Sequence, residues 1–236
     1  MLDVTARRES FPVGIRAAVD FRVYLITDRE LASGCGLLPA VERALAGGVR
    51  AVQLREKDLG GRELLELARK MRELTARHGA KLLVNDRVDV ALASGADGVH
   101  LGESSIPPEE ARRLLGPGRL IGVSTHSGEQ LAAVQAAGAD FAVFGPVYYT
   151  PSKAAYGPPL GVDALRRACA SARIPVFALG GVGPRNINEV IAAGADGIAM
   201  ISAILAAEDP QRAASEINDS VNDAISKHRE GQEERS

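Results

Sequence analysis

The stretch GADGVHL, from Gly95 to Leu101, decides the fold because its first part recurs along the chain. The tripeptide Gly-Ala-Asp returns at residues 138–140 and 194–196, and each copy closes a predicted helix and leads into an apolar strand. Glycine readily takes the left-handed backbone conformation that ends a helix. The sequence therefore predicts one helix-to-strand turn that is used three times.

Apolar strand patterns alternate with amphipathic helix patterns on both sides of this turn. The predicted strands cover residues 23–27, 51–54, 81–84, 98–101, 120–124, 140–144, 175–179 and 197–200. The predicted helices cover residues 37–46, 61–78, 88–93, 108–115, 127–137, 162–172, 184–193 and 209–227. Eight strand–helix units predict an α/β protein with the (β/α)8 TIM-barrel fold, in which the repeated turns lie at the N-terminal face and serve stability. A doubly wound open sheet is the alternative, but no GxGxxG follows the first strand.

Length and composition indicate one barrel domain over residues 21–227, with a lead-in at 1–20 and a polar tail at 228–236 that frays. The 28 basic and 30 acidic residues nearly cancel, so no bulk charge attracts nucleic acid or an acidic membrane. No run reaches the roughly 18 apolar residues that a membrane span needs, and residues 1–21 lack the apolar core of a signal peptide. We therefore expect a cytoplasmic protein with small-molecule partners, in which Cys35 and Cys169 are reduced. The oligomeric state stays open, with a homo-oligomer as one alternative.

Polar side chains follow every predicted strand, at the rim where (β/α)8 barrels place their reactive groups. They are Asp28 and Arg29; Gln53, Arg55, Glu56, Lys57 and Asp58; Asn85, Asp86 and Arg87; His100, Glu103, Ser104 and Ser105; Ser124, Thr125 and His126; Thr150, Ser152 and Lys153; Gly180, Gly181 and Gly183; and Ser202. Such convergence on one rim predicts an active site there.

Three parts of this rim suit anions. The turn at residues 180–183, GGVG, together with Ile201 and Ser202 offers backbone N–H groups to a phosphate, at the usual phosphate site of such barrels. The loop with Thr150, Ser152 and Lys153 supplies two hydroxyls and an ammonium.

The third part contains Arg55 and Lys57 near Asn85 and Asp86, where Asp86 could hold a Mg²⁺ that bridges two phosphates. The alternative role for Asp86 is to cap the helix at 88–93. These sites predict either a diphosphate together with a monophosphate, or a bisphosphate.

Taken in order, several motifs resemble the landmarks of thiamine phosphate synthases and their TenI-like relatives. They are YLITDR, AVQLREKDL, LLVNDRVDVAL, GADGVHLG, GVSTHS, FGPVYYTPSK, ALGGV and GADGIAMISAI, which together extend from about Val23 to Pro210. The resemblance implies a barrel enzyme that joins hydroxymethylpyrimidine diphosphate to a thiazole phosphate, forming thiamine phosphate and releasing pyrophosphate. It implies a dissociative transferase mechanism without a protein nucleophile.

The resemblance also implies roles for individual residues. The pyrimidine diphosphate would be held by Gln53, Arg55, Lys57, Asn85 and Lys153, with Asp86 on Mg²⁺ and Ser124 near the reacting centre. The thiazole phosphate would be received by Thr150, Ser152, Gly181, Ile201 and Ser202. Departure of the diphosphate would be stabilised by Mg²⁺, Arg55, Lys57 and Lys153.

One position departs from the synthase pattern. The Asp that serves there as the second metal ligand is replaced by Ser105, which predicts a weaker metal site, although Glu103 could substitute. The TenI-like alternative isomerises a carboxylated thiazole phosphate by proton transfer, with His126 as its acid/base group. The complete REKD and TPSK motifs favour the synthase.

Two further alternatives are a non-catalytic barrel that binds thiamine precursors for regulation and a barrel enzyme that acts on another sugar phosphate. The first conflicts with the retained Lys57, Asp86 and Lys153, and the second leaves REKD and TPSK unexplained. His100 is predicted to be a packed, hydrogen-bonded structural histidine, and no cysteine cluster supports a zinc site.

Overall fold

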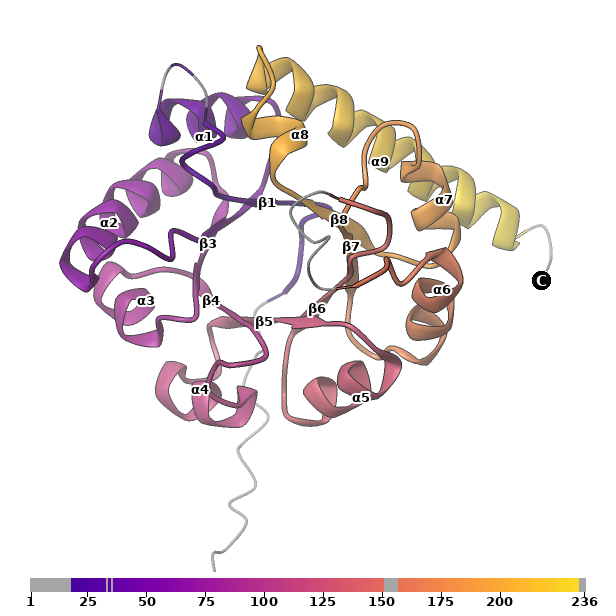
Figure 1. The fold of residues 1–236 in the computed structure, drawn as a ribbon, viewed down its shortest axis with the longest axis horizontal. Coiled ribbons are helices and arrows are strands. Elements are labelled where there is room, and N and C mark those ends of the chain that lie inside the picture. The colour runs from indigo at the N-terminus through magenta and orange to yellow at the C-terminus, as the bar shows by residue number, and fades with distance from the viewer. Residues whose placement is uncertain (1–17, 33, 35, 151–156, 234–236) are drawn as a thin grey trace, which may run out of the picture.

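The computed structural model of the protein describes residues 18–32, 34, 36–150 and 157–233, with side chains as far as residue 230. Eight parallel strands pair in chain order and close into a barrel, as Figure 1 shows. The strands are β1 Val23–Ile26, β2 Ala51–Leu54, β3 Lys81–Asn85, β4 Gly98–Leu101, β5 Leu120–Thr125, β6 Phe141–Phe144, β7 Val176–Leu179 and β8 Gly197–Met200. The predicted (β/α)8 fold is confirmed, and each predicted strand boundary lies within one residue of the observed one.

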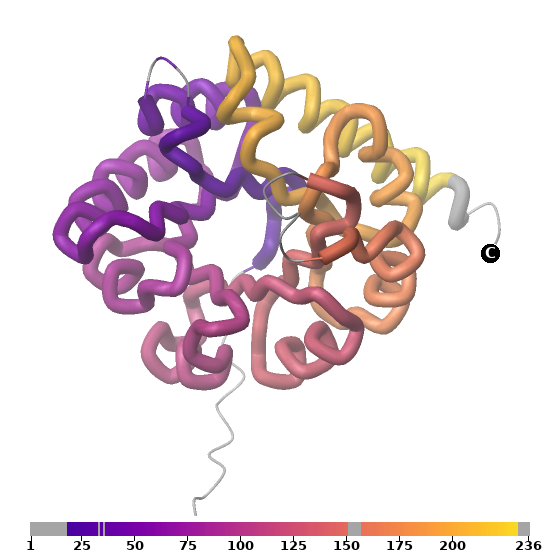
Figure 2. The backbone as a smooth tube through the Cα atoms, in the orientation of Figure 1, coloured from indigo at the N-terminus to yellow at the C-terminus, as the bar shows by residue number. Residues whose placement is uncertain are grey.

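A ring of helices surrounds the barrel (Figure 2). They are α1 Leu37–Ala46, α2 Gly61–Arg77, α3 Val88–Ser94, α4 Pro108–Leu115, α5 Gly128–Ala136, α6 Val162–Ser171, α7 Ile187–Ala192, α8 Ser202–Leu205 and α9 Pro210–Glu233. Helix α9 packs against α1, α7 and α8. None of the helices within the described ranges combines the length and apolar character needed to cross a membrane.

The largest departures from the predicted helices are at α7, α8 and α9, and the other helix boundaries lie within one residue of the prediction. Helix α7 begins at Ile187 rather than residue 184, because the side-chain oxygen of Asn186 accepts the N–H of Gly183 and holds the chain in a turn there. Helix α8 is absent from the predicted helices, because a single helical turn is too short to show a period. Helix α9 continues to Glu233, six residues beyond its predicted end at residue 227.

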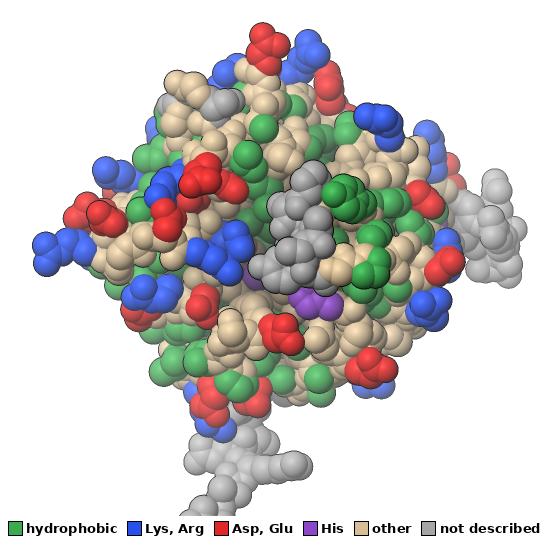
Figure 3. Space-filling model, viewed as in Figure 1, with side chains coloured by type: hydrophobic (Ala, Val, Ile, Leu, Met, Phe, Trp, Pro, Cys, Tyr) green, Lys and Arg blue, Asp and Glu red, His purple; other side chains and the backbone are tan. Residues whose placement is uncertain are grey.

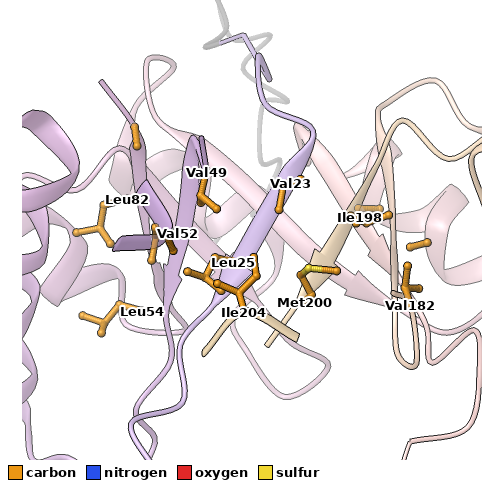
Figure 4. Packing of buried hydrophobic residues seen from close by; sticks show 14 of the residues in the cluster. Val23, Leu25, Val49, Val52, Leu54, Leu82, Val182, Ile198, Met200 and Ile204 are labelled. Carbon is orange, nitrogen blue, oxygen red and sulfur yellow. The ribbon is translucent and has the colours of Figure 1, made fainter. Parts of the chain in front are cut away.

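Alternating strand residues build two cores. Val23 and Leu25 of β1 point outward and pack with the helices in the larger core, part of which is seen in Figure 4. Tyr24 and Ile26 point into the barrel instead. The inner core also contains Phe21, Leu83, Leu120, Phe141, Val143 and Phe177. Its aromatic rings lie at centroid distances of 5.2–6.3 Å, so side chains fill the barrel and the interior is not a pore.

The three Gly-Ala-Asp turns share one hydrogen-bonding device at the N-terminal ends of the strands. The side-chain oxygen of Asp97 accepts the N–H of Leu82 at 2.8 Å, and Asp140 and Asp196 accept the N–H groups of Ile121 and Val176 in the same way. Each carboxylate thus joins the start of one strand to its neighbour. The predicted place of these turns at the N-terminal face, and their structural role, are confirmed.

The lead-in predicted at residues 1–20 falls mostly on residues 1–17, outside the described residues. Directly after it, Phe21 is 2% exposed and belongs to the inner core. Its ring packs edge-on against Phe141.

Candidate active site

Strand pairing brings predicted site residues to the C-terminal rim. Gln53 of β2 lies beside Ile26 of β1 and Leu83 of β3, and Asn85 of β3 lies beside His100 of β4. On the other side of His100, β5 ends with Ser124 and Thr125. Four neighbouring strands therefore deliver Gln53, Asn85, His100 and Ser124 to one side of the barrel mouth, as the sequence predicts.

The loop after β2 is held so that its cationic residues flank a buried carboxylate. Glu56 is 6% exposed and accepts the hydroxyl of Thr27 at 2.6 Å. The same hydroxyl oxygen accepts the backbone N–H of Arg55 at 2.9 Å, which ties the loop to the end of β1. Burial raises the pKa of Glu56, while its bonds from Thr27 and Arg29 act in the opposite direction. Arg55 is half-buried, and Lys57 is exposed.

Asp86 has an unusual backbone conformation. With φ of 64°, it is the one non-glycine residue with positive φ within the described ranges. The N–H of Arg87 bonds to the carbonyl of Asn85 at 2.7 Å, so residues 85–87 form a γ-turn, and the N–H of Asp86 bonds to the carbonyl of His100 at 2.8 Å. Strained conformations of this kind cluster at functional sites. The alternative role as a helix cap is wrong, because Arg87 occupies the N-cap position of α3 and no side chain caps that helix.

The hydroxyl of Ser105 is hydrogen-bonded within its own loop. Its hydroxyl oxygen accepts the N–H of Gly102 at 2.8 Å, while Glu103 is exposed. Within the described ranges, no three His, Cys, Asp or Glu side chains are grouped as a metal cluster. Any cation at this rim would therefore depend on Asp86 together with ligand oxygens and water, which is the manner in which proteins commonly bind Mg²⁺.

Four side chains form a hydrogen-bonded network inside the barrel beneath the mouth. The amide of Gln53 donates to the hydroxyl of Tyr24 at 3.2 Å, and this hydroxyl lies 3.4 Å from Nδ1 of His100. Nε2 of His100 lies 3.0 Å from the hydroxyl of Ser124. Burial, with a smaller contribution from the positive charge of Arg55, lowers the pKa of His100 to about 3, and burial raises the pKa of Tyr24. His100 is thus the packed, hydrogen-bonded residue that was predicted.

The glycine turn after β7 lies against the chain that follows β6. Gly180 and Gly181 have φ of 93° and 63°, and a Cβ at Gly181 would come within 2.7 Å of Tyr148. The amide of Asn186 donates to the carbonyl of Gly181 and closes the turn. Since β7 pairs with β8, the turn neighbours Ile201 and Ser202, and Ser202 begins α8. The predicted phosphate residues after β7 and β8 are therefore adjacent.

Two other predicted site residues, Ser152 and Lys153, lie outside the described residues, whereas Thr150 is described and half-buried. His126 is exposed just past the end of β5. Its ring Nδ1 lies 2.5 Å from the carbonyl of Gly145, and its backbone N–H donates to the side-chain oxygen of Gln130.

Basic side chains lie close to the mouth on this face. Figure 3 shows Lys and Arg side chains beside the centre of the barrel. Within the described part of the chain, Arg55, Lys57 and Asp86 make no ion pair, whereas Arg29, at the same rim, pairs with Asp58 and Glu56. Among the described residues, those three charges therefore lack the neutralising partner that Arg29 has.

Sequence reasoning missed the contributions of three residues to this site. Tyr24 was treated only as a strand residue, although strand alternation in VYLIT places it on the inner face. Glu56 was named among the rim residues without a role, and its place between two cations was the available signal. Thr27 shows no comparable signal, because its role depends on contact between two loops.

The fold and the rim define a (β/α)8 barrel protein with a charged, polar mouth at the C-terminal ends of its strands, where such barrels carry their active sites. The sequence model of the family described as thiamine monophosphate synthase matches residues 23–204. This chain belongs to the thiamine monophosphate synthase family, as its motifs indicated.

Individual relatives agree with this assignment. A Geobacter sulfurreducens protein, provisionally called a thiamine-phosphate synthase, is 64% identical over 198 residues, which are 84% of this chain and 93% of the relative. The thiamine-phosphate synthase of Moorella thermoacetica is 43% identical and covers 87% of this chain and 98% of its own length. A solved structure of thiamine phosphate pyrophosphorylase from Pyrococcus furiosus superposes with a TM-score of 0.79 at 38% identity, covering 87% of this chain and 97% of that one.

Proposed function

We propose that this chain is a transferase that condenses hydroxymethylpyrimidine diphosphate with a thiazole phosphate to give thiamine phosphate and pyrophosphate. The observation that carries the proposal is the group of charges at the mouth. Arg55, Lys57 and Asp86 lie on adjacent loops after β2 and β3 and make no ion pair among the described residues. Within a family of this activity, such a group suits a diphosphate and its cation.

The reaction would proceed by departure of the diphosphate before attack. The bond between the pyrimidine methylene carbon and the diphosphate oxygen breaks, and the electron pair leaves with pyrophosphate. The aminopyrimidine carries the resulting cation, and the thiazole nitrogen lone pair forms the new C–N bond. Arg55 and Lys57 would stabilise the negative charge that develops on the leaving group, and Lys153 is predicted to assist them.

Asp86 fits a Mg²⁺ ion bound jointly with the substrate, because its carboxylate is exposed at the rim and its backbone is held by His100 and the γ-turn. When bound, Mg²⁺ would neutralise charge on the diphosphate oxygens. The residues of this chain would bind and orient the substrate. Gln53 and Asn85 would bind the pyrimidine diphosphate, and Ser124 would lie near the reacting carbon. The expected cytoplasmic location and the alternative of a homo-oligomer remain predictions.

The second phosphate would lie on the opposite side of the mouth. Gly181, Ile201 and Ser202 are adjacent after β7 and β8 and would receive the thiazole phosphate, together with Thr150 and, by prediction, Ser152. Backbone N–H groups in a glycine turn are well suited to phosphate oxygens. Two phosphate regions on opposite sides would place the two organic rings between them.

The proposal is tested by incubating purified protein with both precursors and Mg²⁺ and identifying the product. Thiamine phosphate formed in equal amount to pyrophosphate is the expected result. Isomerisation of a carboxylated thiazole phosphate without condensation would transfer the assignment to the TenI-like tautomerase.

The tautomerase stays as a second candidate because of the geometry of His126. Its Nδ1 is next to the carbonyl of Gly145, which can only accept a hydrogen bond, so Nδ1 carries the proton of that bond and Nε2 is the ring nitrogen that could exchange a proton with a substrate. His126→Gln distinguishes the two candidates, since a tautomerase would lose activity while a synthase would retain most of its turnover.

We further propose that Ser105 weakens Mg²⁺ binding relative to a site with two carboxylates. The hydroxyl of Ser105 is engaged by Gly102, so it offers little to a cation. Ser105→Asp should lower the Mg²⁺ concentration at half-maximal activity, with Ser104→Asp as the control. An unchanged half-saturation in Ser105→Asp would contradict this idea.

A further inference from the structure

The interior network of Tyr24, Gln53, His100 and Ser124 differs from the rest of the inner core in being polar. Tyr24, Gln53 and His100 are 0%, 1% and 2% exposed, whereas Ser124 is half-buried and leads to the mouth. The three contacts between these side chains measure 3.2, 3.4 and 3.0 Å. A buried polar network of this kind fixes the orientation of each member when all are satisfied.

The donor and acceptor in each hydrogen bond of this network can be assigned by starting from the side-chain amide of Gln53. Gln53 donates its N–H to the hydroxyl oxygen of Tyr24, so this hydroxyl has its own proton left to donate. The acceptor within reach is Nδ1 of His100. A neutral imidazole has one ring proton, which must then be on Nε2, from where it is donated to the hydroxyl oxygen of Ser124.

The surroundings of His100 maintain this neutral ring. Gly122 leaves the space that the ring needs, because a Cβ at Gly122 would lie 2.8 Å from Nδ1 of His100 and 2.3 Å from the ring of Phe141. His100 is 2% exposed, and its two ring nitrogens face the hydroxyls of Tyr24 and Ser124 rather than a carboxylate. A neutral ring with a single proton satisfies both of these contacts.

We propose that Tyr24 and His100 are positioning residues that fix the hydroxyl of Ser124 as a hydrogen-bond donor toward an acceptor atom of the substrate at the mouth. Because Nε2–H of His100 occupies a lone pair of the Ser124 oxygen, the Ser124 proton turns away from the network. A donor fixed in this direction stabilises negative charge that develops on a substrate oxygen and need not reorient during the reaction. The inference rests on the proposed function for the identity of that substrate.

The first test measures the tautomer directly. The protein has four histidines, so ¹⁵N-histidine labelling gives a simple spectrum, in which His100→Gln identifies the His100 signals. The expected result is an unprotonated Nδ1 and a protonated Nε2 in the wild type between pH 6 and 8. A proton on Nδ1 would reverse the network and overturn the proposal.

The second test measures kinetic coupling. Tyr24→Phe removes the hydroxyl, and kcat is expected to fall about 3- to 10-fold with little change in KM, as for one neutral hydrogen bond. In a Ser124→Ala background the same Tyr24→Phe change should have no further effect on kcat. An equal fall in both backgrounds would show a purely structural role and contradict the proposal.

A pair of substitutions at His100 completes the design. The amide of His100→Gln can accept from Tyr24 and donate to Ser124, whereas His100→Leu has a similar volume and can do neither. We expect His100→Gln to retain a larger share of wild-type kcat than His100→Leu. Equal losses would count against the proposal, and urea titration of each variant identifies losses caused by unfolding.

The two readouts separate this inference from the proposed function. The tautomer measurement needs no turnover. A wild type with the predicted tautomer that makes no thiamine phosphate would refute the function alone. An active synthase with its proton on Nδ1 would refute the positioning role alone.

Discussion

The two ends of this barrel use charged residues in opposite ways. At the N-terminal end, Asp97 and Asp140 pair with Arg72 and Arg112 and also accept backbone N–H groups. At the C-terminal end, Arg55 and Lys57 follow β2 and Asp86 follows the neighbouring strand β3, and none of the three makes an ion pair among the described residues. The contrast teaches that paired charge ties neighbouring strands together at the N-terminal end, whereas the charges of the proposed site lack such pairs among the described residues.

Breaking a pair at the N-terminal end should have the largest effect on stability. Asp140 has a side chain 4% exposed, and it bonds to Arg112 at 2.6 Å and to the N–H of Ile121. Asp140→Ala would leave a largely buried guanidinium unpaired and should lower the free energy of unfolding by about 3–5 kcal/mol. Urea denaturation measures this.

The matched control is Asp163→Ala, which removes the exposed partner of Arg166 and should change stability by less than about 1 kcal/mol. Similar losses of unfolding free energy in Asp140→Ala and Asp163→Ala would contradict the proposed difference between buried and surface ion pairs.

Removing a cation at the C-terminal end should leave folding intact and damage turnover. Arg55→Ala is expected to lower kcat for thiamine phosphate formation about 10²- to 10³-fold, as for a lost group that stabilises transition-state charge. The control is Arg69→Ala, because Arg69 is exposed on α2 and makes no ion pair with a described residue. Loss of folding in Arg55→Ala, or normal turnover, would contradict the division between the two ends.

Acid should weaken the protein through His100. Its folded-state pKa of about 3 lies below the ordinary value of 6.5, so the unfolded chain binds a proton that the folded protein excludes. Stability from this group is fully present above pH 6.5 and is lost as the pH falls toward 3. The loss is at most about 1.4 kcal/mol per pH unit.

The difference in unfolding free energy between wild type and His100→Gln, measured from pH 7 to 4, isolates this contribution. A difference that does not change with pH would show that His100 titrates normally.

The smallest expected effect is at Asp86. Asp86→Gly relieves the left-handed backbone, because glycine adopts φ near 64° without steric cost, and should raise the free energy of unfolding by up to about 1 kcal/mol. Activity should fall at the same time, since the carboxylate is lost. Asp86→Asn, which tolerates this conformation, separates the backbone effect from the charge. A destabilised Asp86→Gly would mean that the carboxylate supports the fold.

Strand alternation and the repeated Gly-Ala-Asp turn predicted the barrel closely, because both follow from local periodicity. The rim residues Gln53, Arg55, Lys57 and Asn85 also follow from strand ends alone. The backbone strain at Asp86 could not be predicted, since it depends on a hydrogen bond to His100 across two strands. The interior network of Tyr24, Gln53, His100 and Ser124 depends likewise on contacts between strands distant in sequence. The hydrogen bond from Thr27 to Glu56 depends on contact between two loops.

The central claim is that the loops after β2 and β3 form a site for a diphosphate. Calorimetric titration of inorganic pyrophosphate with Mg²⁺ into wild type, Arg55→Ala and Arg69→Ala tests it most directly. We predict binding to wild type and Arg69→Ala that weakens at least about tenfold in Arg55→Ala, the loss expected for one charge-assisted contact. Equal affinity in all three proteins would contradict the account.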